Sequence, residues 1–364
     1  MKKSAIVLFF ALLTVSAFAQ NIQDGVNHLY AERYQSAKAA FEKLRSSNPN
    51  NIEATYWLGQ VHIANNEVPA ARALYEQALA ANGNAPLVLV GMGQVELNEG
   101  KTAEARQRFE AALTASKGKK GDDANVLNAI GRANVQAKEG DAAYAIQKLE
   151  QAAQLAQNNP DVLLNLGNAY RKAHDGGRAI TNYRKATILN PNFARAFYRM
   201  AGIYQTQKNW DVVVENLEKA IAADNKFAPA YLDLYYYYLL YPKDFNKAEG
   251  YANQYVSVAD PSVQNDFLKA QTAYVLKKHD EAISIAQNIL QKAGTNVNPR
   301  VYRVIAYSYV DKGDTAAARP YVDSLFARAN DEDLVGEDFM LKADVIGKSD
   351  PDQLIGIYRT AALR

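Results

Sequence analysis

The chain has no cysteine among its 364 residues. This excludes disulfides, thiolate metal sites and lipid attachment through a thiol, so side-chain packing must stabilise the fold. Proline is also scarce, with 11 residues, while hydrophobic residues make up 48% of the chain, a composition that argues against disorder. Long Ala-rich stretches with Leu, Glu, Gln and Lys predict helix nearly throughout.

Long hydrophobic runs are absent except at the N-terminus. Lys2 and Lys3 precede an apolar run over residues 5–15, and Ala17-Phe18-Ala19 supplies a small-x-small cleavage pattern. The apolar run is too short to span a bilayer comfortably. We therefore expect residues 1–19 to be a secretory signal peptide, the mature chain to have no membrane span, and the protein to be exported to the periplasm or secreted.

The mature chain also lacks net charge. Removing residues 1–19 takes away two lysines and no acidic residue, which lowers the 41 basic residues to 39, equal to the 39 acidic ones. A neutral chain has no global electrostatic attraction to nucleic acid or to an anionic membrane. We therefore expect no nucleic-acid partner.

A motif returns about every 34 residues. Its clearest copy begins at Leu166-Gly167 and continues with Ala179, Tyr183, Ala186 and Pro191. Numbering each repeat from 1 to 34, position 8 is small in six consecutive repeats: Gly25, Gly59, Gly93, Gly131, Gly167 and Ala201. Position 24 is bulky in the same six repeats: Phe41, Tyr75, Phe109, Leu149, Tyr183 and Leu217. Small and large residues alternating at fixed offsets indicate stacked helical hairpins.

This motif resembles the tetratricopeptide repeat. The resemblance implies an all-α, right-handed α-solenoid of about ten antiparallel helix hairpins, with position 8 small where the two helices of a hairpin approach each other. The pattern loosens in the last four repeats, where position 24 of the repeat over residues 263–296 is the small Ala286.

Two insertions divide the predicted array. Residues 116–123 lengthen one turn between repeats, and the step from Gly131 to Ala145 is two residues longer than in neighbouring repeats. We expect an N-terminal sub-array over residues 20–120 and a second over residues 121–364. The second ends inside a hairpin without a polar capping helix, so we expect the natural chain to continue beyond Arg364.

Motifs for catalysis and metal binding are absent from the sequence. There is no H-E-x-x-H and no P-loop, and the repeat places no carboxylate cluster in a cleft. His28 and His62 both stand at position 11 of adjacent repeats, where we interpret them as parts of the layer between helices. We expect no enzyme activity, no cofactor and no metal site.

The first helix of each hairpin lines the concave groove in this family. Groove positions of repeats four to six carry amides and cations, and we select as candidate peptide-binding residues Asn128, Arg132, Asn165, Asn168, Arg171, Arg195 and Arg199. Tetratricopeptide domains that hold carboxylate tails use a clamp of Lys, Asn and Arg, and Asn165, Arg195 and Arg199 match three of its places. Asn128 and Arg132 depart from its other two. Arg forks and Asn amides suit a carboxylate or backbone amides. The alternative is that the asparagines belong to the repeat consensus and the arginines to a solvated face.

A second candidate is the segment YLDLYYYYLLY over residues 231–241. Its apolar and Tyr positions recur on every side of a helix, so they cannot all face inward. We expect Tyr236 to face the groove and to contact a partner, since Tyr is enriched at interfaces. The alternative is a bulky core between repeats.

These features favour a noncatalytic scaffold that binds segments of partner proteins. The signal peptide and the repeat style resemble those of exported proteins of Gram-negative bacteria, where such proteins commonly assist envelope assembly or secretion. Two other hypotheses are a subunit of a large outer-membrane machine and a glycan-handling or hydrolytic component. The sequence does not name the partner.

Overall fold

A computed structural model describes residues 22–118, 121–293, 297–347 and 351–363. The expected signal peptide therefore lies outside the described residues. Ten antiparallel helix hairpins follow one another along these ranges, which confirms the predicted all-α fold of tetratricopeptide-like hairpins. None of the helices described is both long enough and apolar enough to cross a membrane.

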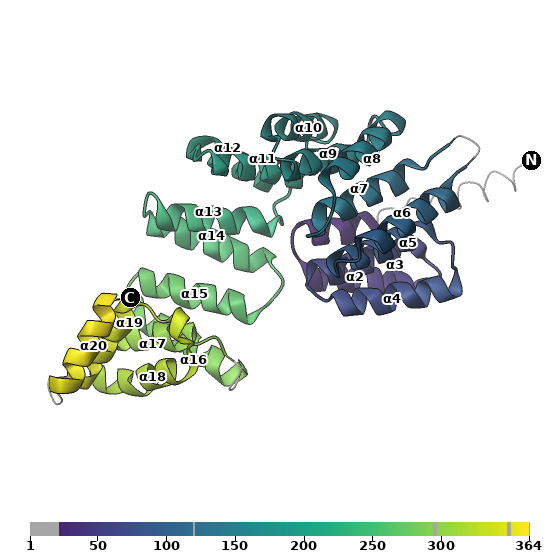
Figure 1. Cartoon of the computed structure of the whole chain (residues 1–364). Helices are drawn as coiled ribbons and strands as arrows, with labels where there is room; N and C mark the ends of the chain where they lie inside the picture. Colours follow the sequence, from purple (N-terminus) through teal and green to yellow (C-terminus); the bar gives the residue numbers. More distant parts are fainter. Residues whose placement is uncertain (1–21, 119–120, 294–296, 348–350, 364) are drawn as a thin grey trace, which may run out of the picture. The chain divides into compact units, whose positions relative to one another are not determined.

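The chain divides into two compact units, drawn together in Figure 1. The first comprises the residues up to Ala230 with residues 258–260, and the second comprises residues 231–257 and those from 261 onwards. The first unit contains a helix over residues 22–30 followed by α2 (Tyr34–Ser47), α3 (Ile52–Ala64), α4 (Val68–Ala81), α5 (Pro86–Asn98), α6 (Thr102–Ser116), α7 (Ala124–Gln136), α8 (Ala142–Leu155), α9 (Pro160–Lys172), α10 (Gly176–Leu189), α11 (Ala194–Thr206) and α12 (Trp210–Ala223).

The second unit continues the hairpins from α13 (Ala228–Leu240), whose first three residues belong to the first unit. It contains α14 (Phe245–Val258), whose last residue belongs to the first unit, and then α15 (Val263–Val275), α16 (His279–Ala293), α17 (Arg300–Asp311), α18 (Thr315–Arg328), the short 3₁₀ helix η1 (Asp331–Asp333), α19 (Gly336–Ile346) and α20 (Pro351–Leu363). Its cores join adjacent helices, for example through Tyr235, Ala248 and Leu268 of α13, α14 and α15.

The bulky residue at position 24 lies directly over the small residue at position 8. A Cβ placed on Gly59 would lie 2.1 Å from the Tyr75 ring, and one placed on Gly91 of the next repeat would lie 2.4 Å from the same ring. Tyr75 thus fills the space both within its hairpin and between hairpins, with its hydroxyl donating to the Tyr56 carbonyl at 2.8 Å. The glycine is required by this close approach, as the repeat pattern predicts.

The turn inside most hairpins has one residue in the left-handed region. This residue stands at position 15 and includes Glu32 (φ 57°), Asn66 (φ 60°) and His174 (φ 61°), while Gly100 (φ 80°) occupies it in the third repeat. A left-handed residue after the helix allows the chain to reverse and pairs the last carbonyls of that helix. The fold therefore accepts side chains at a position where glycine costs least.

The insertion in repeat four replaces this turn. The connection between α7 and α8 runs over residues 137–141, whereas α3 and α4 are joined by residues 65–67. The Lys172 ammonium of α9 donates to the carbonyls of Asn134, Val135 and Ala137 at 2.8, 3.3 and 2.6 Å. A cation at the end of α7 thus satisfies carbonyls that the helix itself leaves unpaired.

The other insertion is the segment between α6 and α7. Gly118 and Gly121 exchange two backbone hydrogen bonds of 3.0 and 3.1 Å between α6 and α7. The helices α5 and α7 pack directly against each other. The sub-array boundary expected between residues 120 and 121 therefore falls inside the first unit, because α5 before the insertion packs against α7 after it.

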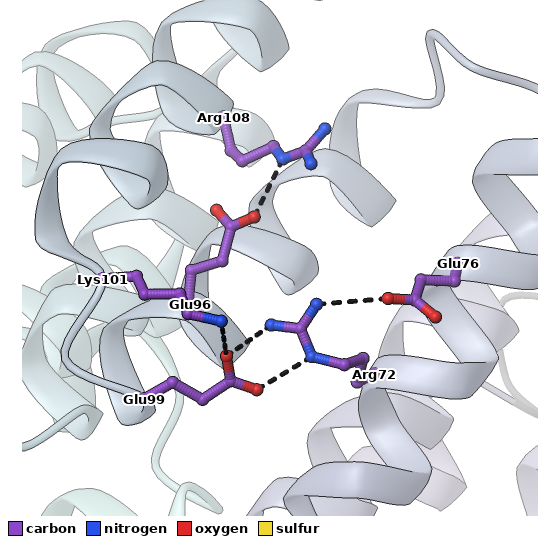
Figure 2. A network of polar contacts seen from close by, with 6 residues as sticks. All are labelled: Arg72, Glu76, Glu96, Glu99, Lys101 and Arg108. Carbon is purple, nitrogen blue, oxygen red and sulfur yellow. Dashed lines mark hydrogen bonds and ion pairs between the residues drawn. The ribbon is translucent and has the colours of Figure 1, made fainter.

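A charged network joins α4 to the hairpin of α5 and α6 (Figure 2). Arg72 forms a fork with Glu99, with its Nε at 2.8 Å and an Nη at 2.6 Å from the carboxylate oxygens, and it also contacts Glu76 at 3.1 Å. Lys101 donates to the same Glu99 at 2.8 Å. Each cation in this network has a carboxylate partner, as is usual for arginines on a solvated helix surface.

Candidate functional site

The first helices of successive hairpins form one surface of the first unit. They comprise the helix over residues 22–30 and the helices α3, α5, α7, α9 and α11, and they carry seven of the eight candidate residues. These seven residues form two groups. One group surrounds the carboxylate of an aspartate, and the other lines a pocket that contains three arginines.

The first group surrounds the Asp161 carboxylate on α9. Asn128 and Asn165 donate to its Oδ2 at 2.8 and 3.1 Å, and the Arg132 guanidinium lies 3.3 Å from the same oxygen. The Tyr30 hydroxyl donates to the other oxygen at 2.5 Å. The amides and the arginine expected to hold a carboxylate therefore do hold one, but it belongs to the chain itself.

Arg132 is buried in this group, with 5% of its side chain exposed. Its guanidinium donates to the Tyr56 hydroxyl at 3.0 Å and stacks over the Trp57 ring at 4.2 Å from the centroid. Burial lowers the pKa of Arg132, but the neighbouring Tyr56, Tyr30 and Asp161 outweigh burial and raise it. The positive charge of Arg132 is thus compensated inside the fold.

Tyr30 connects the N-terminal helix to the later repeats. Its ring lies 6.3 Å from the Phe193 ring, and the Arg195 guanidinium stacks 4.3 Å from its centroid. Arg195 also donates to the Tyr30 carbonyl at 3.1 Å. Burial and the Asp161 charge raise the pKa of Tyr30, so its hydroxyl stays protonated and remains a donor.

Neither Tyr30 nor Asp161 is among the residues predicted from the sequence. Asp161 stands at position 2 of its repeat, the same groove position that Arg195 occupies in the next repeat. The sequence could therefore have identified Asp161 as a groove residue. Tyr30 stands at position 13 of the first repeat, another groove position, but the residues that its hydroxyl contacts lie more than 100 positions away, so the sequence did not indicate its role.

A cavity of about 570 Å³ opens beside the Asp161 network. The lining includes the rings of Tyr56, Trp57 and Phe193 and a set of amide side chains, namely Gln23, Asn27, Asn125, Asn128, Asn159, Asn190 and Asn192. Glu53 also lines it, and burial raises the pKa of its carboxyl, partly offset by a hydrogen bond from Trp57. Rings beside amide donors and acceptors suit an extended main chain with apolar side chains.

The second group surrounds a smaller pocket of about 220 Å³, which Tyr30 also lines. Arg171 on α9 and Arg195 and Arg199 on α11 line it together with Asn165, Asn168 and Gln136. No aspartate or glutamate is among its lining residues, which all lie in the described part of the chain. Burial, followed by the nearby charges of Arg195 and Arg171, lowers the pKa of Arg199 to about 10. At neutral pH the pocket therefore holds three positive charges without a carboxylate.

The eighth candidate, Tyr236, lies in the second unit. It is 42% exposed, and its ring contacts the edge of the buried Tyr235 ring with centroids 4.9 Å apart. Neighbouring tyrosines of this helix differ in exposure. Tyr235 belongs to the core between helices, while Tyr236 presents its ring to the surface.

Comparison with known proteins identifies the repeat and adds several distant structural likenesses. The tetratricopeptide repeat family model matches residues 25–86 and 90–160. No curated protein matches the chain.

The chain is similar to human IFIT1, solved as a dimer with PPP-AAAA, at 16% identity and a TM-score of 0.48, covering 82% of this chain and 69% of that one. MamA is 23% identical at a TM-score of 0.34, covering 47% of this chain and 97% of MamA. YrrB, described as a tetratricopeptide protein with an unusual peptide-binding site, is 24% identical at a TM-score of 0.33, covering 52% and 95%.

The family model and the geometry agree on the same residues. Gly25, Gly59, Gly93 and Gly131 all lie within the matched ranges, each beneath the bulky side chain at position 24 of its own hairpin. Residues 25–86 and 90–160 of the chain are therefore tetratricopeptide repeats.

Proposed function

We propose that this protein is a noncatalytic scaffold that holds an extended segment of a partner protein against the first helices of the first unit. Tetratricopeptide repeats form protein-interaction scaffolds, and this chain follows that general pattern. The observation that carries the proposal is the 570 Å³ cavity, whose amides and rings match the polar main chain and the side chains of a peptide.

The proposal extends to the location of the protein. The pattern of residues 1–19 supports export, and in the periplasm or outside the cell a segment-binding scaffold would serve envelope assembly or secretion. Amino-terminal sequencing of protein recovered from the periplasm or the medium tests this part. A first residue of Gln20 is expected, and recovery of the intact chain only from the cytoplasm would contradict it.

Filling the cavity tests the binding mode. Asn125 is exposed at the start of α7 and lines only this cavity among those described, so Asn125→Trp should occupy the space without disturbing the Asp161 network. Affinity capture from envelope extract, followed by titration of the captured partner, should show at least about a tenfold loss of affinity, equivalent to ~1.4 kcal/mol.

The matched control is Asn50→Trp, an exposed asparagine in the turn before α3 that does not line the cavity. It should retain wild-type affinity. Partner binding that survives Asn125→Trp unchanged would contradict the proposed binding surface.

A further inference from the structure

The arginine pocket offers more hydrogen-bond donors than acceptors. The Asn165 side chain donates to Asn128 and Asp161, which leaves its Oδ1 as an acceptor. The Asn168 Oδ1 already accepts from the Tyr183 hydroxyl at 2.8 Å, which leaves its amide hydrogens for another acceptor. The Tyr30 hydroxyl is engaged with Asp161, and the Gln136 Oε1 accepts from Gln94 at 3.0 Å. A ligand that fits this lining must itself bring the acceptors.

Among the three arginines of this pocket, Arg199 carries a donor that is both shielded and unpaired. Its Nε is shielded from solvent and has no hydrogen-bond partner. Arg195 stands one helical turn away on α11, and Arg171 approaches from α9. Like charges gathered around a shielded donor oppose folding, and an anion in the pocket would relieve both the repulsion and the missing hydrogen bond.

We propose that this pocket binds the phosphoryl group of a phosphate monoester carried by the partner segment. The inference rests on the proposed scaffold function, because it names the chemical group by which the groove recognises its partner. A single carboxylate brings one negative charge and two oxygens, whereas a phosphoryl group brings up to two charges and three strong acceptor oxygens. Three guanidinium groups around one small space match the second set better than the first.

Small probes test this preference directly. Calorimetric titration of the purified chain with methyl phosphate, inorganic phosphate and acetate at pH 8 should show binding of both phosphates and at least about tenfold weaker binding of acetate. Lowering the pH to 5 should weaken methyl phosphate binding, because its second ionisation lies near pH 6 and the dianion is lost.

The protein groups around the pocket do not imitate that pH effect. Burial raises the pKa values of Tyr30, Tyr34 and Tyr183, and Arg199 stays charged with its pKa of about 10. Burial lowers the pKa of His28, which lines a neighbouring cavity with Arg195. Its protonation at low pH would add positive charge and strengthen anion binding, which is the opposite sign.

Two variants and a control assign the binding to the pocket. Arg199→Gln should reduce phosphate affinity at least about tenfold, and so should Arg171→Gln, which is exposed and should fold normally. Lys185→Gln removes an exposed cation outside the pocket and should have no effect.

Three results would overturn the inference: acetate binding as tightly as methyl phosphate, inorganic phosphate binding without methyl phosphate, or phosphate affinity unchanged in both arginine variants. The chain could fail to bind phosphate and still capture a partner whose binding Asn125→Trp weakens. That result would overturn the phosphate inference and leave the scaffold function in place.

Discussion

Two arginines of the same unit, Arg132 and Arg199, face opposite situations. Arg132 meets a carboxylate, two tyrosine hydroxyls and an indole ring, and its pKa is raised. Arg199 meets two further arginines and no carboxylate in its pocket, and burial lowers its pKa to about 10. The same residue type at groove positions of nearby repeats is therefore compensated by a carboxylate of the chain in one place and has none in its pocket in the other.

The largest effect should come from breaking the compensated arginine. Arg132→Met leaves Asp161 with one cation fewer and Tyr56 without its donor, and we expect it to lower the free energy of unfolding by about 3 kcal/mol. Urea denaturation measures the loss. The double variant Arg132→Met/Asp161→Asn should lose less free energy of unfolding than the sum of the two single variants, since both changes disrupt one network. Strictly additive losses would show that the two residues are not coupled.

A smaller effect of opposite sign is expected at the uncompensated arginine. Arg199→Met keeps a long side chain and removes a charge repelled by Arg195 and Arg171, so it should raise the free energy of unfolding by about 1 kcal/mol in phosphate-free buffer. Urea denaturation measures this change in the free energy of unfolding as well. A loss of stability as large as that of Arg132→Met would mean that Arg199 is a structural residue and would abolish the contrast.

The smallest effect is expected in the pH dependence of stability, through His28, which lines a cavity with Tyr30 and Arg195. Burial, followed by the Arg33 charge, lowers the pKa of His28 in the folded chain below its usual 6.5. The unfolded chain then binds more protons as the pH falls through this range, so this histidine contributes stability above pH 6.5 that is lost at lower pH. Thermal unfolding between pH 7 and pH 5 should show a shallower decline for His28→Gln than for the wild type. Equal slopes would rule out this contribution.

Much of the fold follows from local pattern. Gly59 beneath Tyr75 and Gly167 beneath Tyr183 occur at fixed offsets, since both members of each pair lie in one hairpin and the period of the sequence places them together. The insertion before Ala145 was predicted by the same count, and it appears as the longer connection over residues 137–141. The cap that Lys172 provides there was not predictable, because it comes from the following hairpin.

The candidate site was predictable only as a set of residues. Asn128, Arg132 and Asn165 do gather, and so do Arg171, Arg195 and Arg199, as groove positions of adjacent repeats should. Their division into a closed network and an open pocket depends on Tyr30, which approaches from the first repeat. Its approach depends on the curvature of the first unit, the sum of many small packing angles that no single repeat specifies.

The sequence by itself determined the repeat, its hairpins, the small and large positions that pack them, and the polar residues at groove positions. These features are local, so residues within one or two hairpins are enough to specify them. Only the tertiary structure decided which polar residues meet a charge of the chain itself and which are left without one. That distinction depends on contacts across more than a hundred residues, as between Tyr30 and Asp161, where burial and charge balance are properties of the folded unit.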